Sequence, residues 1–185
     1  LSRRHADTDA AGFSESLDWG LRTVLLGAVP AALGLLALAE PLVSTIYQRG
    51  QFDARAATMT ALSLSAMSLA IPAFMLSKVL APAFYARQDT RTPMRAAIIT
   101  VFVNIGLIAA IVTPLWWYDV VGAHAGIALA TALAGIGHAV LLWRYVRRAG
   151  VWQAQPGWGR ALARIALAGV AMVAVLIALR HGPWD

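Results

Sequence analysis

The sequence predicts an all-α, polytopic membrane protein with five transmembrane helices. Of its 185 residues, 59% are hydrophobic and only 13% are charged, and the mean hydropathy is +0.67. A soluble domain has about 25% charged residues. The apolar residues fall into five long stretches, and most of the charges lie in the gaps between them. A crossing of the bilayer needs about 20 such residues, so each stretch is expected to form one crossing.

The first crossing is predicted over residues 18–47. The preceding residues 1–17 are polar and are expected to form a cytoplasmic loop with a short amphipathic helix that approaches the membrane. Pro30 and Pro41 lie within the apolar stretch, where neighbouring helices can satisfy the carbonyl groups that proline frees. We therefore expect a bent helix here and not a broken one.

Three further crossings are predicted over residues 54–86, 93–117 and 122–148. Each contains more than 20 consecutive uncharged residues, which is enough to span a hydrocarbon core of about 30 Å. Trp116 and the aromatic residues beside it close the third of the five stretches and are typical of a membrane interface. Residues 18–150 are thus predicted to form a unit of four crossings.

Residues 151–185 are predicted to hold a linker and one additional transmembrane helix at about 158–181. Arg164 interrupts this apolar stretch, but a long arginine side chain can extend its charged group to the interface. Trp152 and Trp158 suit the lipid headgroup layer. This helix makes the fifth crossing.

Positive charge is divided unequally between the two sides that alternating crossings define. Eleven arginines fall on the side of Leu1, namely Arg3, Arg4, Arg22, Arg87, Arg91, Arg95, Arg144, Arg147, Arg148, Arg160 and Arg164. Three fall on the opposite side, namely Arg49, Arg55 and Arg180. Because positive residues gather on the cytoplasmic side of a membrane, we expect the Leu1 side to be cytoplasmic and the Asp185 side to lie outside. Nucleic-acid binding is not predicted, since the basic residues are not clustered with aromatic residues on a soluble face.

The loop between the second and third crossings contains three arginines, Arg87, Arg91 and Arg95, and fixes the orientation of the other elements. Pro93 is suited to a first helical turn, because its ring presets the backbone angle. Thr92 precedes it and is predicted to accept hydrogen bonds from the first N–H groups of the new helix.

Four runs of sequence carry a resemblance to a known family. They are the stretch from Pro30 to Leu42, with Pro30-Ala31-Ala32-Leu33-Gly34-Leu35 and Leu38-Ala39-Glu40-Pro41-Leu42; Tyr47-Gln48-Arg49-Gly50-Gln51-Phe52; Lys78 to Pro93; and Gln155-Pro156-Gly157-Trp158. In this order and spacing the chain resembles the MurJ (MviN) family of lipid II flippases. That family belongs to the multidrug/oligosaccharidyl-lipid/polysaccharide exporter superfamily.

The resemblance implies a bacterial inner-membrane protein of about fourteen helices, with two six-helix lobes around a central cavity and two further helices. It implies transport of lipid II, the undecaprenyl-pyrophosphate-linked peptidoglycan precursor, to the periplasmic leaflet by alternating access. On that plan the chain would hold helices nine to thirteen, within the second lobe and just after it. The N-terminal lobe and the last helix would be its partners within the same protein, along with membrane lipids. The chain alone is not expected to transport.

Four cations are candidate substrate-binding residues on this reading. Lys78 lies at the end of the second apolar stretch and is expected either to contact the substrate's phosphates or to anchor the helix at the interface. Arg87, Arg91 and Arg95 would meet the diphosphate at the cytoplasmic mouth, since arginine pairs well with phosphate oxygens. The alternative for all three is to anchor the loop and hold anionic lipid headgroups.

A second set of candidates lies on the third and fourth crossings. His124, Thr131 and His138 recur at helical spacing and share one face with small residues. This stripe is expected either to line the cavity or relay protons, or to allow close helix packing. Asn104 is the other intramembrane polar residue. Some superfamily members bind sodium with such an Asn, an acid four residues later and a Thr on the next helix, but Ile108 occupies the acidic position here, so no metal site is predicted.

No nucleotide-binding loop, metal-ligand cluster or nucleophile arrangement is present in the sequence, so no cofactor is predicted and transport is favoured over catalysis. A related exporter of drugs or of other polyprenyl-linked saccharides stays open, because the spans and charges permit it equally. A non-transporting membrane scaffold, or an enzyme acting on lipid-linked sugars, is a further alternative. Such an enzyme would need grouped acids, whereas Asp53, Asp89 and Asp119 are single and on different sides.

Overall fold

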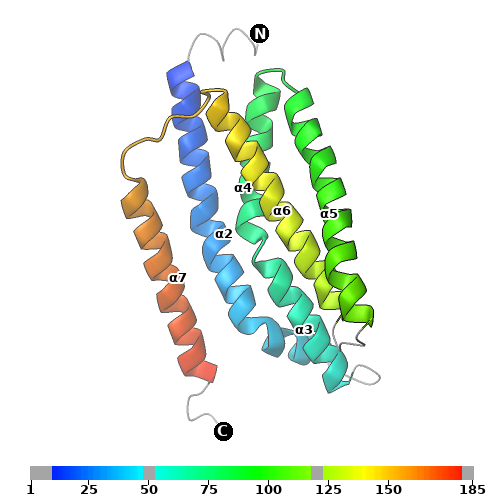
Figure 1. Ribbon diagram of the computed structural model, residues 1–185. Coiled ribbons are helices and arrows are strands. Elements are labelled where there is room, and N and C mark those ends of the chain that lie inside the picture. The colour runs from blue at the N-terminus through cyan, green and yellow to red at the C-terminus, as the bar shows by residue number, and fades with distance from the viewer. Residues whose placement is uncertain (1–9, 48–52, 118–122, 181–185) are drawn as a thin grey trace.

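The computed structural model describes residues 10–47, 53–117 and 123–180, and the described part is helical throughout, with short connections (Figure 1). The helices are α2 (Ala10–Tyr47), α3 (Ala54–Ser68), α4 (Ile71–Ala86), α5 (Arg91–Trp117), α6 (Ala123–Arg148) and α7 (Trp158–Arg180). With α3 and α4 counted as one span, five spans in the described residues are long and apolar enough to cross a membrane. The predicted all-α fold with five crossings is therefore confirmed.

Helix α2 begins at Ala10, eight residues before the predicted start of the first crossing. Its first turns bury Ser14, Leu17, Asp18 and Leu21, which recur every three or four residues and form one helix face. The short helix predicted within residues 1–17 is thus continuous with the first crossing, because packing of this face extends the helix beyond the apolar stretch. The helix continues through both of its prolines, as expected.

The predicted helix over 54–86 is instead two helices, α3 and α4, separated at Leu69 and Ala70. Pro72 is the physical cause, because it has no N–H to donate to the carbonyl oxygen of Ser68. The N–H of Ala70 donates to the carbonyl oxygen of Met67 at 3.0 Å, which tightens the turn. The break occurs within the span, so the second crossing consists of two consecutive helices.

Helix α4 lies between α2 and α6 in the middle of the bundle, with α5 against α6 on one flank and α7 against α2 on the other (Figure 1). The main apolar core lies at the end where α2 begins and α4 and α6 end, which we call the basic end because Arg87, Arg91 and Arg148 lie there. Its buried members are Leu17, Leu21, Leu80, Ala83, Phe84, Ala96, Leu142 and Val146. A smaller cluster between α2 and α3 lies at the opposite end.

Two glycines allow helices to approach closely. A Cβ atom added to Gly135 of α6 would lie 2.3 Å from a ring carbon of Phe74 on α4. One added to Gly169 of α7 would lie 2.5 Å from a methyl carbon of Leu33 on α2. Glycine at such contacts is typical of membrane helices, where association depends on close van der Waals packing.

Helix α4 ends in a Schellman motif, in which two N–H groups beyond the helix bond back to its last carbonyls. The N–H of Asp89 donates to the carbonyl oxygen of Phe84 at 3.0 Å, and that of Gln88 donates to Tyr85 at 2.9 Å. Gln88 has φ of 59°, a left-handed conformation that glycine adopts more easily. Helix α6 ends in the same motif with Gly150 at the equivalent position, with φ of 65°.

We expect Gln88→Gly to stabilise the full-length protein slightly. Removing the side chain relieves the left-handed strain, and the greater freedom of glycine in the unfolded chain offsets part of the gain, so the net effect is about 0.5 kcal/mol. Thermal unfolding in detergent measures it. Gln88→Ala is the control, since alanine has the same backbone restriction. Equal stabilisation by both variants would show that the backbone angle is not the cause.

Candidate functional site

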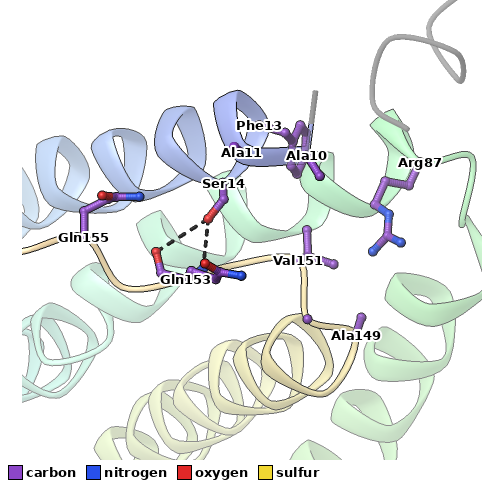
Figure 2. Close-up of a pocket in the computed structure, with 10 residues that line it drawn as sticks. Ala10, Ala11, Phe13, Ser14, Arg87, Ala149, Val151, Gln153 and Gln155 are labelled. Carbon is purple, nitrogen blue, oxygen red and sulfur yellow. Dashed lines mark hydrogen bonds between the residues drawn. The ribbon is translucent and has the colours of Figure 1, made fainter. Parts of the chain in front are cut away.

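A cavity of about 430 Å³ at the basic end is lined by the first residues of α2, by Arg87 at the end of α4 and by the chain that follows α6. Figure 2 shows Arg87 at one side of this cavity and Ser14, Gln153 and Gln155 at another. Arg91 and Arg95 are also exposed at this end but do not line the cavity. Of the three loop arginines, Arg87 therefore has the most enclosed surroundings.

The side chain that accepts a hydrogen bond at the start of α5 is that of Asp89, whereas the sequence predicted Thr92. The carboxylate of Asp89 accepts a hydrogen bond from the N–H of Thr92 at 3.0 Å and one from its hydroxyl at 2.5 Å. The prediction that Thr92 accepts was wrong, because the helix begins at Arg91 and Thr92 already lies in its first turn. These hydrogen bonds lower the pKa of Asp89 below its usual value of 3.8. The hydrogen bond from the Thr92 hydroxyl has the largest effect.

The lowered pKa predicts a pH-dependent contribution to stability. A carboxyl group with a depressed folded pKa stabilises the protein fully above its usual value and loses this contribution as pH falls through the folded value. We therefore expect the stability difference between the full-length protein and its Asp89→Asn variant to be constant above about pH 4 and to shrink in more acidic solution. Chemical unfolding across this pH range measures it. A difference that persists unchanged in acid would contradict the assignment.

Lys78 lies on the exposed face of α4, together with Met75, Pro82 and Tyr85. The opposite face of α4 carries the buried Leu80 and packs into the core. Among the described residues Lys78 has no hydrogen-bond or ion-pair partner. Its charge is therefore available to a group outside the described part of the chain.

Of the stripe predicted on α6, the structure shows His138 in contact with a neighbouring helix. Nδ1 of His138 lies 3.0 Å from the hydroxyl oxygen of Thr100 on α5, whereas Thr131 bonds within its own helix, donating to the carbonyl oxygen of Ile127. Asn104 is half-buried and makes no hydrogen bond within the described residues, so the structure does not bring it together with Thr131. The side chain of His124 lies outside the described residues.

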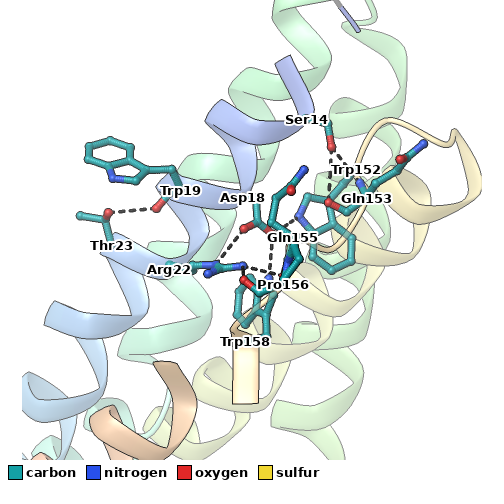
Figure 3. Close-up of polar contacts among 10 residues, drawn as sticks. All are labelled: Ser14, Asp18, Trp19, Arg22, Thr23, Trp152, Gln153, Gln155, Pro156 and Trp158. Carbon is teal, nitrogen blue, oxygen red and sulfur yellow. Dashed lines mark hydrogen bonds and ion pairs between the residues drawn. The ribbon is translucent and has the colours of Figure 1, made fainter. Parts of the chain in front are cut away.

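Asp18 of α2 forms a second polar centre, close to the basic end (Figure 3). One carboxylate oxygen accepts hydrogen bonds from the indole N–H groups of Trp152, at 2.9 Å, and Trp158, at 2.7 Å. The other lies 2.8 Å from Nε of Arg22, in an ion pair that lacks the alignment of a hydrogen bond. The Asp18 side chain is only 3% exposed. The carboxylate therefore holds the α6–α7 linker and the first residue of α7 against α2.

Arg22 strengthens this attachment through the backbone of the same linker. Its guanidinium donates to the carbonyl oxygens of Gln155, at 2.7 Å, and Pro156, at 3.1 Å. It also lies 5.1 Å from the ring centre of Trp158, within cation–π range. We call Asp18, Arg22, Trp152 and Trp158 the linker clamp.

Comparison with known proteins identifies the family. The family model described as Lipid II flippase MurJ matches residues 1–184. The chain belongs to the MurJ family. Relatives in that family include a protein of Burkholderia cenocepacia named Lipid II flippase MurJ, 39% identical over 183 residues, and one of Vibrio cholerae named Probable lipid II flippase MurJ, 38% identical over 177 residues.

These matches cover 98% and 96% of this chain but only 33% and 32% of the respective relatives. A solved structure of MurJ in an inward closed conformation matches the fold with a TM-score of 0.77 and 25% identity, over 100% of this chain and 36% of that protein. The chain therefore spans about a third of the length of the MurJ proteins that it matches, and it has their helical membrane fold.

The linker clamp is not predicted from the sequence. The prediction placed Trp152 and Trp158 in the headgroup layer, whereas their indole N–H groups turn inward to Asp18. A signal was present: Asp18 lies between Leu17 and Leu21 on an apolar helix face, where an acid needs a buried partner. The two tryptophan partners lie more than 130 residues away in sequence, so no local pattern identifies them.

Proposed function

We propose that this chain forms about a third of a lipid II flippase in the bacterial inner membrane. The whole protein would move undecaprenyl-pyrophosphate-linked peptidoglycan precursor from the cytoplasmic to the periplasmic leaflet by alternating access, as a transporter and not an enzyme. The observation that carries the proposal is the match of the family model over residues 1–184, on a chain with five spans. The remaining lobe and the last helix would complete the cavity.

The orientation is part of the proposal. The basic end would face the cytoplasm, with the Leu1 side cytoplasmic and the Asp185 side periplasmic. The described arginines support it: Arg87, Arg91, Arg95, Arg144, Arg147 and Arg148 are all exposed at or near the basic end. At the opposite end, Arg180 is paired with Glu40 at 2.9 Å. Positive residues at one end are typical of the cytoplasmic face.

The exposed cations would act on the diphosphate of the cargo. Arg87 would meet it at the cytoplasmic mouth, with Arg91 and Arg95 adding to the positive field. Lys78 lies nine residues deeper along α4, about 14 Å at 1.5 Å per residue, so it would contact the headgroup within the membrane. The prenyl tail would stay in lipid, because its transfer to a polar cavity is unfavourable.

Growth rescue tests the proposed function. Cells depleted of their own lipid II flippase are expected to grow when they produce the full-length protein that carries this segment. The 185-residue chain alone is expected not to rescue them. A full-length protein that reached the membrane, failed to rescue growth and exported dyes would instead support a related drug exporter.

Replacing Lys78 by glutamine is expected to impair rescue without loss of protein from the membrane. Removing a cation that pairs with a phosphate weakens binding roughly tenfold. The Lys78→Arg variant is expected to retain function, and Arg55→Gln at the opposite end is the control for loss of one positive charge. Plating efficiency, with membrane abundance measured in parallel, tests this. Normal growth of the Lys78→Gln strain would show that Lys78 does not bind the substrate and only anchors the helix at the membrane interface.

A further inference from the structure

The contact between His138 and Thr100 determines which nitrogen of the histidine carries a proton. The hydroxyl oxygen of Thr100 lies 2.8 Å from the carbonyl oxygen of Ala96 and 3.0 Å from Nδ1 of His138. A carbonyl oxygen can only accept, so the single hydroxyl proton of Thr100 points to Ala96. Nδ1 of His138 must then be the donor to Thr100. In the neutral ring, Nε2 is left with a free lone pair that can take up a proton.

This histidine lies deep within the span. Thr100 follows the first residue of α5 by nine positions, and His138 precedes the last residue of α6 by ten, which places both about 14–15 Å from the basic end. Ionisable side chains at such depth are costly and commonly mark a transport pathway. His138 is half-buried, so its ring is not sealed inside the core.

Lys78 lies at the same depth on a neighbouring helix. Helices α4 and α6 both run toward the basic end, since Arg87 and Gly150, just beyond their ends, line the same cavity there. Phe74 of α4 packs against Gly135 of α6. Lys78 follows Phe74 by one helical turn, and His138 follows Gly135 by nearly one turn in the same direction.

The charged surroundings of His138 are entirely basic. Helix α6 packs against α3, α4 and α5, and none of these four helices contains an Asp or Glu. Their ionisable residues are Arg55 on α3; Lys78 and Tyr85 on α4; Arg91 and Arg95 on α5; and His124, Arg144, Tyr145, Arg147 and Arg148 on α6. A proton on Nε2 therefore has no carboxylate counter-ion on these helices, and a bound anion would supply the missing negative charge.

We propose that His138 is a proton-binding site linked to the binding of a phosphate-bearing anion beside Lys78. The anion attracts the proton, Nε2 accepts it from water, and Nδ1–H keeps its hydrogen bond to Thr100. Linkage is reciprocal, so protonation of His138 strengthens anion binding by the same factor. The inference rests on the proposed function, since a diphosphate headgroup is such an anion. It assigns a proton to the transport cycle.

Nitrogen-15 NMR of histidine-labelled full-length protein in detergent tests the first step. The His138 signal, identified by its loss in His138→Gln, is expected to show the Nδ1–H tautomer. Thr100→Val is expected to move the proton to Nε2, and Thr100→Ser to retain it on Nδ1. The signals of the other histidines serve as internal controls. An Nε2–H tautomer in the unmodified protein would overturn the proposal.

A pH titration of the same signal tests the linkage, with inorganic pyrophosphate as the anion. Pyrophosphate is expected to raise the proton affinity of His138 roughly fivefold, the lower end of typical coupling between sites. Lys78→Gln is expected to abolish this rise. A proton affinity unchanged by pyrophosphate, or raised equally in Lys78→Gln, would overturn the linkage. Neither readout needs transport, so a failure here is distinct from a failure of growth rescue.

Discussion

Replacing Asp18 by alanine is expected to lower the free energy of unfolding of the full-length protein by about 3–5 kcal/mol. The substitution leaves Arg22 without its ion-pair partner and removes the acceptor of two indole N–H groups around a carboxylate that is only 3% exposed. Breaking an ion pair that contains a buried carboxylate, and leaving buried donors without their acceptor, is among the more costly changes in a protein. Thermal unfolding of the purified protein in detergent measures the loss.

Two variants make the Asp18 experiment specific. Glu15 is an exposed acid one turn earlier on α2, and Glu15→Ala is expected to change stability by less than about 0.5 kcal/mol. Asp18→Asn keeps one acceptor oxygen and is expected to fall between the two. If Asp18→Ala destabilised no more than Glu15→Ala, the linker clamp would not hold α7 to the bundle.

Replacing Gly135 by alanine is the second change with a large expected effect. The added methyl group would lie 2.3 Å from a ring carbon of Phe74, so α4 and α6 must separate or the ring must leave its position. Inserting a carbon into a packed contact typically costs about 1–3 kcal/mol. Thermal unfolding in detergent measures this loss of stability. The double variant Gly135→Ala, Phe74→Leu has a smaller side chain opposite the new methyl group and is expected to recover part of the stability.

Gly137 provides the matched control on the same helix. A Cβ atom added there meets no atom within 4 Å, and alanine is favoured over glycine inside a helix by about 0.5–1 kcal/mol. Gly137→Ala is therefore expected to be neutral or stabilising. Equal destabilisation by both variants would mean that the loss at Gly135 reflects something other than contact with Phe74.

Hydrophobic stretches were enough to predict the five crossings, because a membrane span needs a long uncharged segment whatever its neighbours. The ends and interruptions of the helices needed more. Helix α2 starts early because Ser14 and Asp18 find partners in a linker that lies far away in sequence. The break at Pro72 was missed because Pro30, Pro41 and Pro82 lie inside continuous helices, so proline alone does not locate a break.

The candidate site was predicted in its residue types but not in its contacts. Lys78 and His138 stood out as ionisable groups in apolar stretches, which requires only the sequence. The partner of His138 is Thr100, an ordinary residue of α5 that no motif marks. Asp89 accepts from Thr92 because the helix starts two residues earlier than Pro93 indicates. Such pairings depend on helix register, which packing determines.

The interruption between α3 and α4 has a mechanical consequence. A continuous helix resists bending along its whole length, whereas the missing hydrogen bond to Ser68 leaves one point where bending costs less. We expect this point to act as a pivot inside the second crossing. We therefore expect α3 to change its tilt against α2 and α6 more easily than α4, whose Leu80 and Phe84 lie in the main core. In the proposed flippase, this difference would let one end of the pathway widen while the other stays narrow.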